Sequence, residues 1–130
     1  MSERGGIRFI DSAEAPAALG PYSQAVVSGG LLFTAGQIGL DPATGELVEG
    51  GFEGETRQVL ANLRAVLKAA GTDFSGVVKA TLFVTDMALF PVLNRLYGEA
   101  MGEHRPARST VQVAALPKGA LVEIDLVARL

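Results

Sequence analysis

The segment at residues 77–85 constrains the fold of this 130-residue chain more than any other. Its sequence, VVKATLFVT, is β-branched and apolar on both faces, a pattern typical of a strand in the middle of a sheet. Apolar residues recur at helical spacing on either side of it, which predicts helices at residues 53–70 and 90–101. Gly71 is expected to end the first helix, and Pro91 fixes the start of the second, because proline is tolerated only in the first turn. A strand between two helices favours crossover connections and a mixed sheet.

Short apolar segments supply the remaining strands. They are expected at residues 7–10, 23–28 and 31–37, with two more within residues 105–128. Residues 1–6 are expected to fray. The order β-β-β-α-β-α-β-β predicts one two-layer α+β domain spanning residues 1–130, with both helices on one face of the sheet. The other face is left uncovered, with Val77, Phe83 and Leu121 expected on it. Since the chain is 48% hydrophobic with a mean hydropathy of +0.31, we expect this face to pack against other subunits.

The composition excludes several kinds of site. The chain has no cysteine, which excludes disulfides, thiolate nucleophiles and cysteine-ligated zinc, and a reducing, cytoplasmic location is expected. A single histidine, His104, excludes a multi-histidine metal site within one chain. The net charge is −3, and no basic tract suggests a nucleic-acid partner. No apolar run is long enough to cross a membrane, and the N-terminus lacks the apolar core of a secretory signal.

The segment at residues 105–128 (RPARSTVQVAALPKGALVEIDLVA) is typical of two strands joined by a Pro-Lys-Gly turn. Arg108 begins the first strand, where its guanidinium can hold a carboxylate through two parallel hydrogen bonds. Glu123 and Asp125 lie two residues apart on the second strand, so both project to the same face. Carboxylates on a face expected to form an interface are costly unless they are paired or functional. The alternatives are a surface ion pair for Arg108 and a partly hydrated face for the carboxylates.

The register of these strands decides whether Arg108 and Glu123 can share a site. In a hairpin centred on Lys118, Glu123 lies opposite Gln112. Arg108 is then four residues along, roughly 13 Å away at about 3.3 Å per residue. Both side chains point to one face if the turn holds an even number of residues, but the separation is long for direct cooperation. A site that uses both is therefore expected to be completed by a neighbouring subunit.

Three further residues are candidates for a ligand site. Tyr22 follows a stiff Gly-Pro turn that can present its ring at a cleft, with packing inside the loop as the alternative. Gly36 ends a strand and either lets a ligand approach the backbone closely or marks a bulge. Asn94 lies within a helix among apolar residues, where it either makes a polar contact or faces water. His104 falls in a loop and is expected to be exposed rather than catalytic.

Nearly the whole chain resembles the RidA family, also called the YjgF family. The matching segments are APAALGPYSQAV (15–26), LLFTAGQIGLDPATGELV (31–48), ETRQVLANLRAVLKAAG (55–71), VVKATLFVTDM (77–87) and residues 105–128, the last being close to the family signature. The resemblance implies a chorismate-mutase-like fold and a homotrimer in which the sheets form a central barrel, the helices lie outside and clefts lie between subunits. It also implies hydrolysis of reactive enamines and imines, such as 2-aminoacrylate, 2-iminopropanoate and 2-iminobutanoate, to 2-oxo acids and ammonia, without a metal or cofactor.

The resemblance also implies roles for individual residues. Arg108 matches the arginine that binds the substrate carboxylate, and Glu123 matches the acidic residue that positions or activates water. Tyr22 matches a tyrosine lining the cleft, and Gly36 matches a glycine whose backbone contacts the ligand. Asn94 matches a recurrent asparagine on the second helix.

The chain departs from the family pattern at a few positions. Ala35 stands where the deaminases often carry serine, and Arg105 where an aromatic or apolar residue is frequent. The loop at residues 102–105 is short, and Leu89 replaces a frequent Asp helix cap. The substrate range therefore stays open. Two other functions also stay open: a non-catalytic small-carboxylate-binding or regulatory protein, and a ribonuclease or translation inhibitor. Retention of both the arginine and the glutamate favours an enzyme, and the acidic net charge weighs against the ribonuclease.

Overall fold

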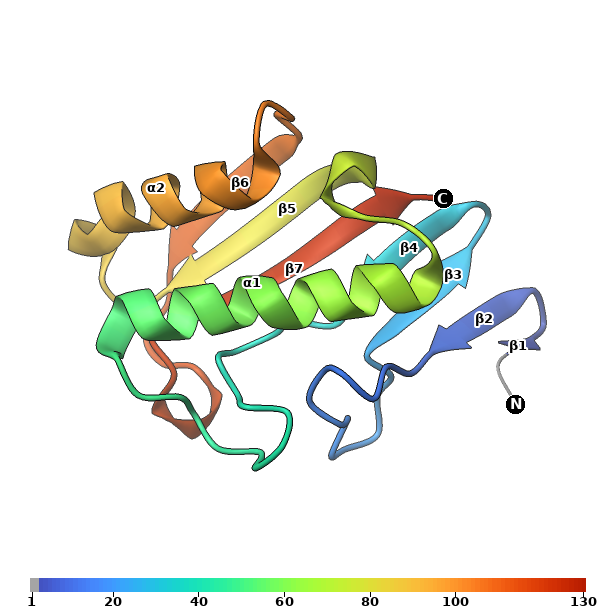
Figure 1. Cartoon of the computed structure of the whole chain (residues 1–130), viewed down its shortest axis with the longest axis horizontal. Coiled ribbons are helices and arrows are strands. Elements are labelled where there is room, and N and C mark those ends of the chain that lie inside the picture. Colours follow the sequence, from blue (N-terminus) through green and yellow to red (C-terminus); the bar gives the residue numbers. More distant parts are fainter. Residues whose placement is uncertain (1–2) are drawn as a thin grey trace.

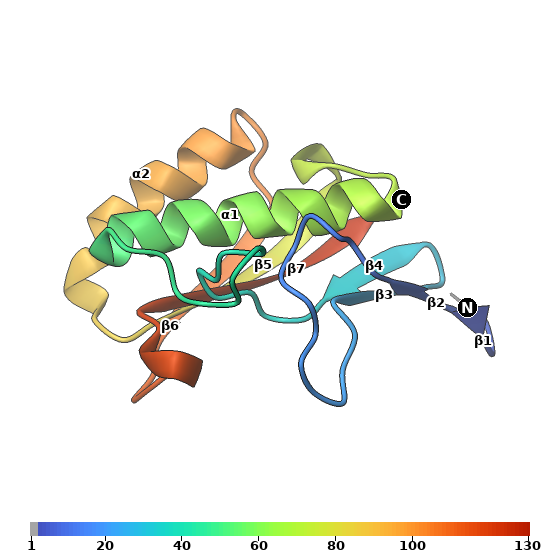
Figure 2. The ribbon, with the colours of Figure 1, turned by 60° about the horizontal axis from the view of Figure 1, so that its bottom comes forward.

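The computed structural model describes residues 3–130, in which the strands form one mixed sheet covered on one face by two α-helices (Figure 1). The strands are β1 (Glu3–Arg4), β2 (Ile7–Ile10), β3 (Ala25–Ser28), β4 (Leu31–Thr34), β5 (Val77–Val84), β6 (Ala107–Gln112) and β7 (Val122–Arg129). The helices are α1 (Gly51–Ala70) and α2 (Phe90–Met101), with short 3-10 turns η1 (Phe74–Gly76), η2 (Met87–Leu89) and η3 (Pro117–Gly119). The sheet order is β1-β2-β3-β4-β7-β5-β6, and only β5 and β6 are parallel. Figure 2 shows both helices above the same side of the sheet, so the predicted two-layer mixed sheet is confirmed.

Both helices begin and end where local sequence signals place them. α1 starts at Gly51, slightly before the predicted residue 53, and ends at Gly71, whose φ of 89° is the left-handed conformation that glycine adopts easily. α2 occupies the predicted residues 90–101, with Pro91 in its first turn, where the missing N–H costs nothing. The helical spacing of the apolar residues then turns one stripe of each helix toward the sheet.

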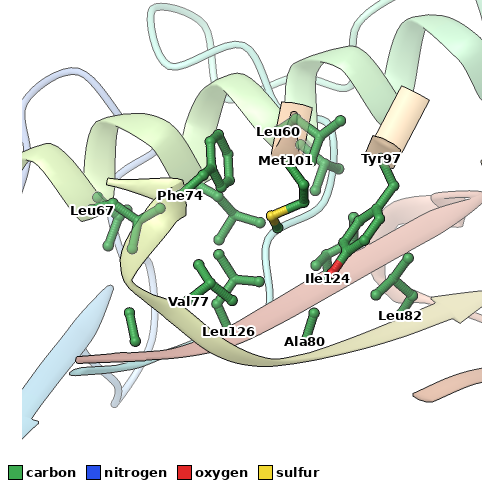
Figure 3. Close-up of a cluster of buried hydrophobic side chains, with 14 of the residues drawn as sticks. Leu60, Leu67, Phe74, Val77, Ala80, Leu82, Tyr97, Met101, Ile124 and Leu126 are labelled. Atoms are coloured by element: carbon green, nitrogen blue, oxygen red, sulfur yellow. The ribbon is translucent and has the colours of Figure 1, made fainter. Parts of the chain in front are cut away.

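The core lies between the helices and the sheet (Figure 3). Leu60 from α1 and Tyr97 and Met101 from α2 point down onto Leu82 of β5 and Ile124 of β7. The helix-facing residues of β7 are almost completely buried: Val122, Ile124, Leu126 and Ala128. Burying one such aliphatic side chain contributes about 1.5–3 kcal/mol, which accounts for a central position for this strand.

The face of the sheet away from the helices, called the open face below, differs partly from expectation. Val77 was predicted to lie on it, but a bulge between Val77 and Lys79 turns Val77 beneath the helices, where it is fully buried. Leu121 packs partly against the core as well. Phe83 does project to the open face, as its pairing with Glu123 requires. A further apolar row crosses the open face through four paired residues, Phe9, Val26, Phe33 and Val127.

A short hairpin formed by β1 and β2 was missed, because residues 1–6 were expected to fray. β1 pairs with β2, and the turn between them is formed by Gly5 and Gly6, both with positive φ. Residues 1–2 lie outside the described residues.

The prediction that the strands within residues 105–128 form a hairpin is wrong. β5 lies between β6 and β7, so that Phe83 pairs with Val111 on one side and with Glu123 on the other. The connection includes η3 and is too long to be a tight hairpin turn. β6 instead follows the crossover helix α2 and joins β5 in parallel, which is the usual result of a β-α-β connection. β7 then enters the sheet between β4 and β5.

Candidate functional site

Arg108 and Glu123 project from opposite faces of the sheet. Arg108 pairs with Ala80, which is fully buried beneath the helices, and directly paired side chains share a face. Glu123 pairs with Phe83 on the open face. The two residues also lie two strand spacings apart, about 10 Å, and three residues apart along the strands, again about 10 Å. The option that both side chains point to one face is therefore wrong, and they cannot meet within one chain.

Glu123 lies in a pocket of about 160 Å³, called the Glu123 pocket below. The pocket is lined by residues from the loops at 16–24 and 36–40, by the turn Pro117–Gly119 and by Glu123 itself. Two of the predicted site residues, Tyr22 and Gly36, are among them. Tyr22 is 57% exposed, so its ring is available at the pocket mouth rather than packed inside the loop. Three of the five predicted site residues therefore share this pocket.

Gly36 is held against Glu123 by backbone pairing. Gln37 and Ile124 exchange two hydrogen bonds, with N–O distances of 2.9 and 3.1 Å, which sets the chain of residue 36 beside β7. A Cβ built on Gly36 would lie 2.7 Å from Cδ of Glu123, closer than real Cβ contacts allow. Gly36 thus leaves the space that the Glu123 carboxyl group occupies.

The environment of Glu123 favours its protonated form. Burial raises the pKa of Glu123, and the neighbouring carboxylate of Asp125 raises it further. Burial likewise raises the pKa of Asp125, although the ammonium group of Lys79 opposes the shift. Because its pKa is raised, this carboxyl group is a better proton acceptor when ionised than an ordinary glutamate, which suits it to accepting and returning a proton.

Buried polar side chains hold the loops of the Glu123 pocket in place, and none of these side chains was predicted as a site residue. Gln24, 2% exposed, accepts from the Ser12 N–H at 2.6 Å and donates to the carbonyls of Ser12 and Pro16 at 3.1 and 2.8 Å. These bonds hold the loop that carries Tyr22. The buried Glu55 accepts from the Leu121 N–H at 2.8 Å, just after η3.

Asn62 anchors another loop of the same pocket. It is 1% exposed. Its Nδ2 donates to the carbonyls of Ile38 and Leu40 at 3.3 and 3.0 Å, and its Oδ1 accepts from Gln58 at 2.8 Å. These three hydrogen bonds satisfy the Asn62 amide, which would otherwise be buried without partners.

Arg108 lies in a second pocket, of about 330 Å³, on the helix side of the sheet. This pocket, called the Arg108 pocket below, is lined by Asn94, Tyr97, Gly98, Arg105, Pro106 and Arg108. The guanidinium carbon of Arg108 lies 5.0 Å from the ring centre of Tyr97 and 5.4 Å from that of Phe90. Two aromatic faces within about 6 Å orient the cation without neutralising it.

Two polar side chains that line the Arg108 pocket have an unpaired atom, and so does a third side chain on the same face of β6. Within residues 3–130, the buried Asn94 Oδ1, Tyr97 OH and Thr110 Oγ1 have no hydrogen-bond partner. Burial raises the pKa of the Tyr97 phenol, while Arg108 and Arg105 both lower it, so that both cations act on this group. Buried polar atoms are nearly always paired, and a cluster of exceptions beside a cation marks a place for a ligand. Tyr97 and Thr110 were not predicted as site residues, and nothing in their spacing singles them out.

The described part of the chain offers no metal site. No group of three or more His, Asp or Glu residues is arranged to hold an ion. His104 is only partly exposed, and its Nε2 lies 2.6 Å from the carbonyl oxygen of Val77, so it secures a loop. No helix among residues 3–130 is long and apolar enough to span a membrane.

Comparison with known proteins places the chain in a family. A sequence model of the family described as Endoribonuclease L-PSP matches residues 12–130. The chain belongs to this family, the RidA family. A RidA-family relative from Capra hircus, named 2-iminobutanoate/2-iminopropanoate deaminase, is 50% identical over 121 residues, covering 93% of this chain and 88% of that protein.

Solved RidA-family structures share the fold. A putative endoribonuclease from Thermotoga maritima aligns with a TM-score of 0.92 and 50% identity, covering 95% of this chain and 97% of that one. YyfA from Yersinia pestis, described as a protein of unknown function of the conserved Rid family, aligns with a TM-score of 0.93 and 47% identity over 95% and 99% of the two chains. The arrangement of two helices on a mixed sheet is therefore that of the family.

Proposed function

We propose that this protein hydrolyses reactive 2-imino acids, among them 2-iminopropanoate and 2-iminobutanoate, to 2-oxo acids and ammonia. The observation that carries the proposal is the Arg108 guanidinium, which is stacked on two aromatic rings and has no carboxylate within 4.0 Å among residues 3–130. Such a cation is prepared for the carboxylate of a small acid. The deaminase names of mammalian relatives at 48–50% identity support the same reaction.

The two pockets suggest how the site is assembled. We propose a homotrimer with a central barrel formed by the open faces, in which each cleft combines Arg108 of one subunit with Glu123 of the next. The apolar row on the open face supports this assembly, because exposed apolar surface of that kind marks an interface. The opposite orientations of Arg108 and Glu123 support it too, since a single chain offers only half of the required groups.

The chemistry then follows from the two halves. Arg108 and the polar groups beside it bind the substrate carboxylate, while Asn94 contacts the ligand from α2. The Glu123 carboxylate takes a proton from water as the water oxygen bonds to the carbon of the protonated imine, giving a neutral carbinolamine. Glu123 then gives this proton to the amino nitrogen, and the C–N bond breaks as ammonia leaves. The hydroxyl proton passes to the Glu123 carboxylate as the 2-oxo group forms, and Glu123 releases it to ammonia or solvent, which restores the carboxylate. Tyr22 and the Gly36 backbone line the cleft, and positioning supplies much of the rate because the imine is already electrophilic.

A coupled assay tests the proposal. A pyridoxal-phosphate-dependent dehydratase generates 2-iminobutanoate from threonine, and release of 2-oxobutanoate is followed with and without this protein. We expect acceleration by the wild type and a loss of about 100-fold in kcat/KM for Arg108→Ala, since two charge-assisted hydrogen bonds are removed. Arg64→Ala, on the outer side of α1, is the matched control and should keep full activity. No acceleration by the wild type would exclude the deaminase, and 2-oxobutanoate binding without acceleration would point to a ligand-binding protein.

RNA cleavage is the second candidate, because the family description names an endoribonuclease. The net charge of −3 disfavours it, since binding to phosphates depends on basic residues. Incubation of the same preparations with single-stranded RNA separates the two functions. Cleavage that is lost in Arg108→Ala but kept in Arg64→Ala would favour the nuclease.

A further inference from the structure

Arg105 brings a second guanidinium into the Arg108 pocket. Both arginines line this pocket with Asn94 and Tyr97. Arg105 is exposed, but its loop holds it in place: its Nη1 donates to the His104 carbonyl at 2.9 Å and to the Gly102 carbonyl. Its hydrogen bonds to other groups of residues 3–130 involve only Nη1, so Nε and Nη2 remain available to a ligand.

The two positive charges have no counter-ion in the described part of the chain. The ion pairs of residues 3–130 involve Arg57, Lys68 and Arg95, and no carboxylate lies within 4.0 Å of Arg105 or Arg108. Two like charges facing one partly enclosed space repel each other, which is unfavourable unless an anion binds between them. The unpaired hydroxyl groups of Tyr97 and Thr110 can donate to acceptor oxygens of a ligand, whereas Asn94 Oδ1 can accept a hydrogen bond from one.

We propose that Arg105 makes the site selective for 2-imino acids whose side chain carries a second carboxylate. This inference rests on the proposed function. Arg108, stacked between rings and partly buried, holds the carboxylate next to the reacting carbon. Arg105, exposed at the rim, holds the carboxylate of the side chain. The second carboxylate takes no part in the hydrolysis: water still replaces the imine nitrogen, and ammonia still leaves. Substrates of this class arise when the α-amino group of a dicarboxylic amino acid is oxidised to an imine.

Competing substrates provide the test. An amino-acid oxidase with catalase generates the imines of glutamate and of 2-aminobutanoate, and kcat/KM for hydrolysis of each is measured above the uncatalysed rate. We expect the wild type to favour the glutamate-derived imine by about tenfold, as one added charge-assisted hydrogen bond provides. Arg105→Gln should remove this preference, and Arg105→Lys should keep most of it. Arg64→Gln, which deletes the same charge outside the Arg108 pocket, should leave the ratio unchanged.

Equilibrium binding separates this inference from the proposed function. The stable product analogues 2-oxoglutarate and 2-oxobutanoate are titrated calorimetrically into the wild type and the same variants. Tighter binding of 2-oxoglutarate that is lost in Arg105→Gln would support the selectivity, even if neither imine were hydrolysed. Equal affinity of the wild type for both acids, or an equal loss for both in Arg105→Gln, would overturn it while leaving the deaminase proposal intact.

Discussion

The Glu123 carboxyl group occupies the space in which a side chain at Gly36 would begin. A Cβ on Gly36 would lie 2.7 Å from Cδ and 3.0 Å from Cγ of Glu123. Gly36 has no positive φ, so its backbone conformation does not require glycine. The position of the Glu123 carboxylate instead requires that residue 36 has no side chain.

Gly36→Ala should therefore impair activity much more than stability. The added methyl group pushes the Glu123 side chain aside, and a displacement of about 1 Å can cost on the order of 100-fold in rate. We therefore expect kcat/KM for 2-iminobutanoate to fall by about tenfold or more, with little change in Tm. A double-mutant cycle is the control: in a Glu123→Gln background, Gly36→Ala should have almost no further effect. Additive losses would show that Gly36 acts independently of Glu123.

The raised pKa of Glu123 predicts how activity depends on pH. The carboxylate must be ionised to accept a proton from water, so kcat/KM should rise with pH through a pKa above the ordinary value of 4.5. Asp125→Asn removes the like charge beside Glu123 and should move this rising limb to lower pH. Burial is the larger cause of the raised pKa, so the pKa read from the rising limb of the pH profile should stay above 4.5 in Asp125→Asn. A limb that does not move in Asp125→Asn would contradict the proximity effect.

The same variant has a predictable effect on stability. Burial raises the pKa of Asp125 above 3.8, its ordinary value, so the folded state holds the proton more tightly than the unfolded state. The stabilisation is fully present at pH below the unfolded pKa and is lost as pH rises through the folded one. Asp125→Asn should thus raise Tm relative to the wild type at pH 7, and the difference should disappear near pH 3. Thermal unfolding of both proteins between pH 3 and pH 7 measures the difference in Tm at each end of this range.

Local signals were enough to predict most of the fold. Pro91 and Gly71 mark helix ends whatever surrounds them, and the apolar stripes identify the helix faces that pack on the sheet. The two-sided apolar pattern of residues 77–85 identified β5 as an interior strand. The predicted pairing of β6 with β7 was wrong because strands that follow each other in the chain need not be neighbours in the sheet. The place of β7 between β4 and β5 is decided by contacts between residues far apart in the sequence.

The candidate site, like the fold, could be predicted from the sequence only in part. The residue types of Arg108, Glu123 and Tyr22 drew attention to them, because the fold alone does not call for an arginine or carboxylate there. Their distribution between two pockets could not be predicted, since it follows from which residue each strand position faces across the sheet. Tyr97 was not predicted as a site residue, because the contact of its ring with Arg108 depends on how α2 packs on the sheet.

Substitutions at Tyr97 should separate the ring from the hydroxyl. Tyr97→Phe keeps the ring under Arg108 and removes a buried hydroxyl that has no partner in residues 3–130, so Tm should stay equal or rise. Tyr97→Leu removes the cation–π contact, worth about 0.5–2 kcal/mol, and frees the guanidinium to move. We expect KM for 2-iminobutanoate to rise about tenfold in Tyr97→Leu and about threefold or less in Tyr97→Phe. Equal KM values for the two variants would rule out the ring as the positioning element.

Subunit mixing tests whether the site combines two chains. Arg108→Ala and Glu123→Gln should each be nearly inactive alone, because every cleft lacks one group. When the two variants are unfolded together and refolded at equal concentrations, some clefts receive Arg108 from a Glu123→Gln chain and Glu123 from an Arg108→Ala chain. Random assembly gives about one quarter of clefts this combination, so about one quarter of wild-type activity should return. The double variant mixed with wild type provides the reference for random assembly, since it too should leave about one quarter of clefts intact. If Arg108 and Glu123 of the same chain formed each site, the two single variants would stay inactive after mixing, which is the outcome that their opposite orientations in the sheet argue against.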